Sequence, residues 1–311
     1  MGYKGSMQIA DLRTPSRKTS SAEADYRAGI NRALAFMQDN LDQPLVLDDL
    51  ARAGGFSPFH FHRIFQAFVG ETPADYRQRL RMKKAADMLR SGSRTITEIA
   101  IFSGYETPSA FTRAFRSWFG ISPSKMRRQK ELPDPGLAVL APAAQPKRRG
   151  KMQPDIRNLP DLKIYYVMQT GMIGNSVDRT ADTAFRKLNA ILMKHGLLEK
   201  VDYCLGISPD EPSSTDPKKF RYGASYVFKE EVDLPAEGEM QVTVYPAGRY
   251  AVFTHKGPYN SLWQTWNTAY RDWLPSSGMR LRELEPFEVY RNNRSNTPPD
   301  KLVTEIFVPI E

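Results

Sequence analysis

Arg63 and Arg113 lie in two similar stretches of sequence 50 residues apart, and each has a phenylalanine two positions away on both sides. A guanidinium group can donate two hydrogen bonds to O6 and N7 of a guanine in the major groove of DNA. The paired arginines therefore suggest a chain that reads two places on a duplex. Both arginines could instead contact only phosphates, and that alternative stays open.

The residues around these arginines sort into two faces at the helical period. One stripe of each stretch is apolar and should be core, while the other could contact bases or phosphates. His60 and His62 lie two positions apart, so they do not share a helix face and do not indicate a metal site. The candidate DNA-contacting residues are Phe59, His60, His62, Arg63, Ser109, Thr112, Arg113 and Arg116.

In the second half of the chain, Glu288 is the residue most suited to bind a ligand. It follows Phe287 in a strand-like PFEVY stretch, where a carboxylate is costly unless it is exposed or paired. One interpretation is a solvent-facing strand position. The other is a carboxylate at the floor of an aromatic pocket that binds an organic cation. The candidate ligand-binding residues are Glu288, Tyr290 on the same strand face, Trp263, Trp266, Tyr222 and Phe307.

Several other chemistries lack the residues that they need. The single cysteine, Cys204, excludes a disulfide framework, a cysteine zinc site and a CxxC redox motif. The second half contains no HExxH, GxSxG or P-loop motif, and its only histidines are His195 and His255. We therefore predict no catalytic residues, no metal site and no cofactor.

The first half of the sequence places the two arginines on expected helices. Apolar residues recur at helical spacing over residues 26–130, interrupted every 10–15 residues by Gly, Pro or Ser. The expected helices cover residues 25–40, 47–53, 58–69 and 73–90, and the last is strongly basic. The pattern of residues 47–70 recurs over residues 96–120. Two short helices joined by a glycine turn form a helix-turn-helix unit, whose second helix fits the major groove.

The second half of the sequence alternates as strands do. Strands are expected near residues 163–167, 241–244, 250–254 and 288–290, and helices near 178–195 and 260–273. A weak internal duplication places Gly206 at the position that Glu288 holds 82 residues later. Each half of the duplication has the order strand, helix, strand, strand. This order predicts an α+β fold of two similar halves that meet at a groove.

The net positive charge of the chain lies in its first part. The 311-residue chain has a net charge of +9, divided as +9 over residues 1–130, +2 over 131–151 and −2 over 152–311. A basic segment favours an anionic partner. Residues 1–24 are expected to be disordered, and the proline-rich, basic residues 131–153 to be a linker. No apolar run is long enough to span a bilayer and no secretory signal is visible, so we expect a cytoplasmic, nucleoid-associated protein.

Two stretches of the first half resemble the paired DNA-binding units of AraC/XylS-type transcription regulators. They are residues 47–76, LDDLARAGGFSPFHFHRIFQAFVGETPADY, and residues 96–126, ITEIAIFSGYETPSAFTRAFRSWFGISPSKM. The resemblance implies an all-α domain over residues 25–130 whose two recognition helices enter successive major grooves. By position, Phe59, His62 and Arg63 would read one half of the DNA site, and Ser109, Thr112 and Arg113 the other.

Residues 154–311 are similar to the GyrI-like effector-binding domain found in multidrug-responsive regulators and at the C-terminus of some AraC-type proteins. The similarity is carried by AGRYAVFTHKGPYNSLWQTWNTAYRDWLPSSG at 247–278, PFEVYRNN at 286–293 and TEIFVPI at 304–310. In that family the glutamate that matches Glu288 lies at the centre of the ligand groove. The GISPDEP stretch at 206–212 departs from the family's GIxYD-like sequence. The resemblance predicts a multidomain protein, with a tandem helix-turn-helix domain followed by two strand-helix-strand-strand repeats.

Together these resemblances imply a ligand-responsive bacterial transcription regulator of the multidrug-sensing type. The expected partners are double-stranded DNA and an aromatic or cationic small-molecule effector that binds near Glu288, with RNA polymerase as a further candidate. Two other functions fit the second half. It could be a hydrolase in which Glu288 and Tyr290 activate water, or a module that mediates only protein contacts. The fused DNA-binding domain favours sensing.

Overall fold

The structure is a computed structural model that describes residues 21–92, 94–128, 152–212 and 215–311. Most of the expected disordered N-terminus and of the expected proline-rich linker lies outside these residues. The described chain forms two compact units. The first contains residues 27–58 and 65–128, and the second contains residues 21–26, 59–64 and 152–311.

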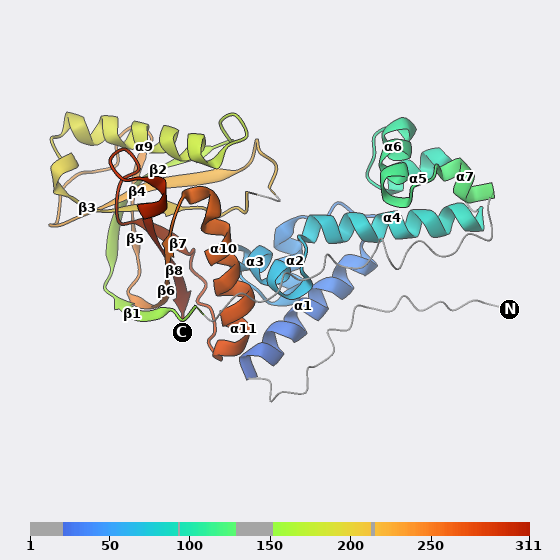
Figure 1. Ribbon diagram of the computed structural model, residues 1–311, viewed down its shortest axis with the longest axis horizontal. Coiled ribbons are helices and arrows are strands. Elements are labelled where there is room, and N and C mark those ends of the chain that lie inside the picture. Colours follow the sequence, from blue (N-terminus) through green and yellow to red (C-terminus); the bar gives the residue numbers. More distant parts are fainter. Residues whose placement is uncertain (1–20, 93, 129–151, 213–214) are drawn as a thin grey trace. The chain divides into compact units, whose positions relative to one another are not determined.

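The first helix-turn-helix unit and its neighbouring helices form where the apolar spacing predicts them (Figure 1). The helices are α1 (Ser21–Asp39), α2 (Leu47–Gly54), α3 (Pro58–Val69) and α4 (Pro73–Ser91). The turn after α2 requires a glycine, because Gly55 has a φ of 73° and its N–H bonds to the carbonyl groups of Ala51 and Arg52. The side chain of Thr72 caps α4 by accepting the N–H of Asp75.

The second helix-turn-helix unit packs against the C-terminal half of α4 (Figure 1). It consists of α5 (Ile96–Phe102), α6 (Pro108–Phe119) and α7 (Pro123–Arg128). Thr95 and Glu98 form a capping box at α5, in which each side chain accepts the other residue's backbone N–H. Ile99, Phe111 and Phe115 are fully buried in the core of this unit. The predicted all-α tandem helix-turn-helix fold is confirmed.

The second unit contains an eight-stranded antiparallel sheet within the described residues. The strands are β1 (Asp155–Leu159), β2 (Leu162–Thr170), β3 (Val201–Ile207), β4 (Arg221–Phe228), β5 (Met240–Tyr245), β6 (Gly248–Lys256), β7 (Phe287–Tyr290) and β8 (Val303–Ile310). Their spatial order is β1-β6-β8-β7-β3-β4-β2-β5. The two halves of the duplication therefore meet where β3 pairs with β7. The strand that precedes each half pairs with the other half. β1, which precedes β2, pairs with β6, and β5, which precedes β6, pairs with β2.

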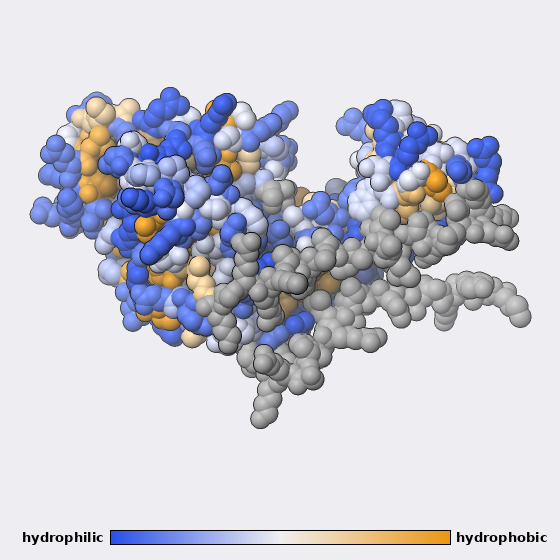
Figure 2. All heavy atoms as spheres, viewed as in Figure 1, coloured by the Kyte–Doolittle hydropathy of each residue, from blue (hydrophilic) through white to orange (hydrophobic). Residues whose placement is uncertain are grey.

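Helices occupy equivalent places in the two halves of this unit. After β2 comes α9 (Val177–Lys194), and after β6 come α10 (Leu262–Asn267), a π-helical turn (Thr268–Trp273) and α11 (Leu274–Ser277). The inner side of α9 packs on β2 and β4. The strand-helix-strand-strand order of both halves confirms the predicted α+β fold. Hydrophilic residues cover most of the visible face of the sheet unit, with apolar patches between them (Figure 2).

Candidate functional site

Glu288 lies at the middle of the sheet, where the two halves of the duplication meet. Its partner in the β3–β7 pairing is Gly206. Its side chain is on the face opposite to that of the neighbouring Phe287, because side chains alternate along a strand. On that face, Oε1 accepts the indole N–H of Trp266 from α10 at 2.8 Å, and Oε2 accepts the hydroxyl of Tyr290 at 2.7 Å. Each carboxylate oxygen therefore has one donor.

A second tyrosine extends this hydrogen-bond chain. The hydroxyl oxygens of Tyr222 and Tyr290 lie 2.7 Å apart. Burial raises the pKa of Glu288, while the hydrogen bonds from Tyr290 and Trp266 and the charge of Arg63 oppose that rise. Burial, and then the negative charge of Glu288, raise the pKa values of both tyrosines. The structure thus brings together four of the six candidate ligand-binding residues, with both phenols protonated at neutral pH.

Gly206 leaves space for the tyrosine pair. It lies directly opposite Glu288, the residue that matches it in the internal duplication. A Cβ atom at this position would overlap the hydroxyl oxygens of Tyr290 and Tyr222. Any larger residue at 206 must therefore displace the hydroxyl groups that hold the carboxylate.

Two aromatic residues that the sequence pattern did not single out, Phe185 and Tyr259, belong to this cluster. The ring centroid of Phe185 lies 6.2 Å from that of Tyr290, and the centroid of Tyr259 lies 5.4 Å from it. The position of each residue in the sequence could have pointed to it. Phe185 follows the fully buried Ala184 on the apolar stripe of α9, and Tyr259 precedes α10 in the GPYNSLW stretch.

Phe307 and Trp263 are not brought to the cluster around Glu288. Phe307 pairs with Phe287, and their rings stack with centroids 4.8 Å apart in the core on the other face of the sheet. The register between neighbouring strands decides on which face of the sheet Phe307 lies, and the sequence alone does not give this register. Trp263 lies near the start of α10 and is 60% exposed.

The first candidate DNA-reading helix, α3, differs from the expected exposed reading face. His60, His62 and Arg63 are buried, with 1%, 4% and 9% of their surface exposed. Nδ1 of His60 lies 2.8 Å from the hydroxyl of Tyr270, and Nε2 lies 2.9 Å from the carbonyl oxygen of Arg282. Burial lowers the pKa of His60 to about 4 and that of His62 to about 3. Both imidazoles are therefore neutral at pH 7.

Arg63 stacks on an aromatic ring. Its guanidinium carbon lies 4.4 Å from the ring centre of Trp266 and 6.0 Å from that of Tyr270. Its Nε lies 3.8 Å from a carboxylate oxygen of Glu211. Trp266 links Arg63 to Glu288, because the indole that carries the guanidinium on its face donates its N–H to the carboxylate. Helical periodicity could not predict this contact, since it joins residues far apart in the sequence.

The second candidate DNA-reading helix, α6, keeps its basic residues accessible. Ser109, Arg113 and Arg116 are exposed, whereas Thr112 of α6 and Phe59 of α3 are half-buried. Figure 2 shows mostly hydrophilic residues on the visible surface around α6. The arginines of α6 are therefore presented to solvent, as direct contact with a duplex requires.

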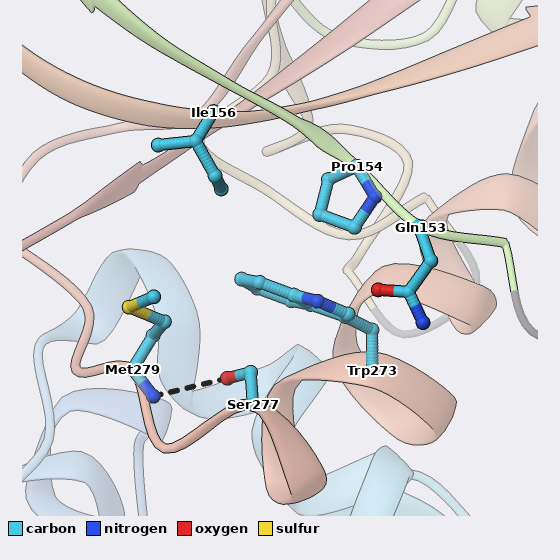
Figure 3. Close-up of a pocket in the computed structure, with 6 residues that line it drawn as sticks. All are labelled: Gln153, Pro154, Ile156, Trp273, Ser277 and Met279. Carbon is cyan, nitrogen blue, oxygen red and sulfur yellow. Dashed lines mark hydrogen bonds between the residues drawn. The ribbon is translucent and has the colours of Figure 1, made fainter.

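The structure also holds a cavity of about 250 Å³ whose lining includes none of the predicted site residues. It is lined by Gln153, Pro154, Ile156, Trp273, Ser277 and Met279 (Figure 3). Trp273 lies flat beneath Ile156 and Pro154, and the backbone N–H of Met279 donates to the hydroxyl of Ser277 at 3.0 Å. The side chains that line this cavity are all uncharged.

Two further findings concern the described residues only. Among them, no group of three or more His, Cys, Asp or Glu side chains is placed to hold a metal ion. In the same part of the chain, no helix combines the length and the apolar character needed to cross a membrane.

Comparison with known proteins gives matches to both halves of the chain. A family model described as a GyrI-like small molecule binding domain matches residues 152–311, and a helix-turn-helix domain model matches residues 50–129. The right origin-binding protein of Escherichia coli K12 is 26% identical over 299 residues, which cover 91% of this chain and 99% of that protein. The transposon Tn10 TetD protein of Escherichia coli is 40% identical over 101 residues, covering 32% of this chain and 73% of TetD. The solved EcmrR–DNA complex has a TM-score of 0.40 at 20% identity and covers 51% of this chain and 57% of EcmrR.

The matched residues agree with the architecture described above. The GyrI-like model covers just over half of the chain, including all eight strands, and the helix-turn-helix model covers the repeated helical units. The right origin-binding protein aligns over nearly its whole length. The chain therefore belongs to the family of AraC-type transcription regulators that carry a C-terminal GyrI-like small molecule binding domain.

Proposed function

We propose that this regulator senses an aromatic organic cation at Glu288 and that binding changes transcription from the DNA that its helix-turn-helix domain recognises. The proposal rests on the hydrogen-bonded carboxylate of Glu288. Each oxygen of Glu288 has one donor, and a carboxylate oxygen can accept a second interaction. The face of Trp266 and the neighbouring tyrosines add cation–π attraction of about 0.5–2 kcal/mol per ring. An aromatic cation gains both terms, whereas a neutral molecule of similar shape gains only stacking.

On the DNA side, we propose that one recognition helix from each unit enters one of two successive major grooves. Arg113 and Arg116, exposed on α6, support this role for the second unit. The net charge of +9 over residues 1–130 adds phosphate contacts, whose contribution falls as salt increases. RNA polymerase is the proposed further partner, since a regulator that responds to a ligand acts at a promoter of the bacterial nucleoid.

The experiment that tests the ligand site compares a matched pair of probes by calorimetry on the full chain. Tetraphenylphosphonium supplies an aromatic cation, and triphenylphosphine oxide supplies similar rings without a charge. We expect the cation to bind at least about tenfold more tightly, which corresponds to about 1.4 kcal/mol. Equal affinities would contradict a site built around the carboxylate. Selection of preferred duplexes from a random pool, with and without tetraphenylphosphonium, tests the DNA side.

A hydrolase is the second candidate, because a carboxyl group whose pKa burial has raised resembles a general base tuned towards neutral pH. We propose that the site is not catalytic. Hydrolysis would leave the helix-turn-helix domain without a role, whereas ligand sensing gives that domain one. Turnover of p-nitrophenyl acetate that disappears in Glu288→Gln would favour the hydrolase, and we expect none above the rate in buffer.

A further inference from the structure

The contact between Arg63 and Trp266 has the chemical form that the proposed ligand would have. A guanidinium is a planar organic cation, and this one lies 4.4 Å from the indole centre with 9% of the residue exposed. The same indole donates to the carboxylate of Glu288, and the carboxylate of Glu211 lies 3.8 Å from Nε. Arg63 therefore already uses the three components of a cation site, which are an aromatic face, nearby carboxylates and exclusion of water.

Two neighbouring contacts hold the segment that carries Arg63. Residues 59–64 belong to the same compact unit as the sheet. One helical turn before Arg63, the imidazole of His60 is hydrogen bonded on both nitrogens, to the hydroxyl of Tyr270 and to the carbonyl oxygen of Arg282. Tyr270 lies in the π-helical turn that follows Trp266, so His60 and Arg63 rest on one continuous helical segment. The stacking of Arg63 is thus part of a built contact.

The hydrogen-bonding capacity of the buried Arg63 guanidinium is nonetheless not fully used. Within the described residues its buried Nε has no hydrogen-bond acceptor, and the oxygen of Glu211 at 3.8 Å is beyond hydrogen-bond distance. Burying a guanidinium N–H without an acceptor costs free energy, because the group loses its hydrogen bonds to water. An aromatic cation without N–H groups can stack on Trp266 without this cost. The guanidinium does donate from Nη1 to the carbonyl oxygen of Phe59, but at 3.4 Å this bond is long. An external cation that replaces Arg63 therefore breaks only this one long hydrogen bond.

We propose that Arg63 is a built-in competitor of the effector, so that an aromatic cation which stacks on Trp266 beside Glu288 displaces Arg63 and frees it for DNA. This inference rests on the proposed function, since it needs both the cation site and Arg63 as a DNA-contacting residue. One guanidinium cannot stack on Trp266 and bond to a guanine or a phosphate at the same time. The two uses of Arg63 exclude each other, and the ligand shifts the population towards the state that binds DNA.

The test measures the affinity of the full chain for tetraphenylphosphonium by calorimetry in the absence of DNA. Arg63→Gln removes the competing charge and should bind the cation about 2- to 30-fold more tightly than wild type, the range that cation–π stacking supplies. Arg63→Lys keeps the charge with a poorer stacking geometry and should lie between the two. Arg113→Gln is the matched control on α6, and its affinity should equal that of wild type. An unchanged or weaker affinity of Arg63→Gln, with its unfolding temperature close to that of wild type, would overturn the inference.

A second measurement separates this inference from the proposed function. If wild type and Arg63→Gln bind tetraphenylphosphonium equally while Glu288→Gln binds it poorly, the cation site stands and the competitor inference fails. If none of these chains binds the cation, both are refuted. With duplexes selected on wild type, the cation should strengthen DNA binding by wild type and leave that of Arg63→Gln unchanged. Equal strengthening in both chains would contradict the release of Arg63.

Discussion

Replacing Glu288 by glutamine removes the charge of the proposed ligand site while keeping its shape. Glutamine can still accept the indole N–H of Trp266 through its amide oxygen, and its amide nitrogen can donate to the hydroxyl of Tyr290. The hydrogen-bonded frame seen around the carboxylate therefore survives. We expect the variant to fold, to bind DNA and to lose most of its affinity for tetraphenylphosphonium.

The size of that loss follows from the position of the carboxylate beside the indole. A cation centred on Trp266 would lie about 6 Å from Glu288, and two unit charges at that distance attract by about 3 kcal/mol at an effective dielectric constant of about 20. Binding of tetraphenylphosphonium should therefore weaken by about 100-fold. Binding of triphenylphosphine oxide should change by less than about threefold, because stacking on the ring remains.

The pH dependence of Glu288→Gln supplies an independent check. The pKa of Glu288 is higher in the folded chain than its ordinary value, so the folded chain binds this proton more tightly than the unfolded chain does. Wild-type stability should therefore fall relative to the variant as the pH rises from the ordinary carboxyl pKa through the raised one. Over the same range, the affinity of wild type for the cation should increase while that of the variant stays flat. Urea unfolding and calorimetry from pH 4 to pH 8 measure both, and a wild-type affinity independent of pH would refute a carboxylate anchor.

Three further predictions address the helices and the sheet. Arg113→Ala should cost about 1–3 kcal/mol at one base position of a selected duplex, and a uniform loss over all sequences would instead indicate a phosphate contact. Gly206→Ala should destabilise the chain by about 1–3 kcal/mol in urea and weaken cation binding, because its methyl group meets the hydroxyl groups of Tyr222 and Tyr290. The pKa of His60 is lowered from 6.5 to about 4, so the unfolded chain binds its proton more tightly and wild-type stability should be lost as the pH falls through this range. His60→Gln should reduce that loss, and an identical pH profile would count against a buried neutral imidazole.

Local signals in the sequence determine the helices closely enough to predict them. The helix predicted over residues 58–69 is observed as Pro58–Val69, because Pro58 suits the first helical position and Gly70 adopts a positive φ at its end. Capping by Thr72 and Thr95 adds a hydrogen bond at the start of α4 and α5. The exchange of β1 and β5 between the two halves could not be predicted, since it depends on which distant strand offers a free edge.

The candidate site was predictable where neighbours in sequence are neighbours in space. Tyr290 shares the face of Glu288 through strand alternation alone. Phe307 could be placed only with the register between β7 and β8, which puts it opposite Phe287. Helical periodicity places Arg63 on the stripe expected to contact bases or phosphates, whereas in the structure Arg63 is buried and stacks on Trp266. Such a contact depends on tertiary packing that no local pattern contains.

The duplication explains why only one of two equivalent sheet positions carries a carboxylate. Gly206 and Glu288 hold equivalent positions in the two halves and face each other across the β3–β7 pair. A second carboxylate at 206 would repel the first, and the space beside Gly206 is taken by the hydroxyl groups of Tyr222 and Tyr290. A small, uncharged residue on one side is therefore the condition for a hydrogen-bonded carboxylate on the other. The symmetry of the fold supplies the place for the site, and the difference between these two residues supplies its charge.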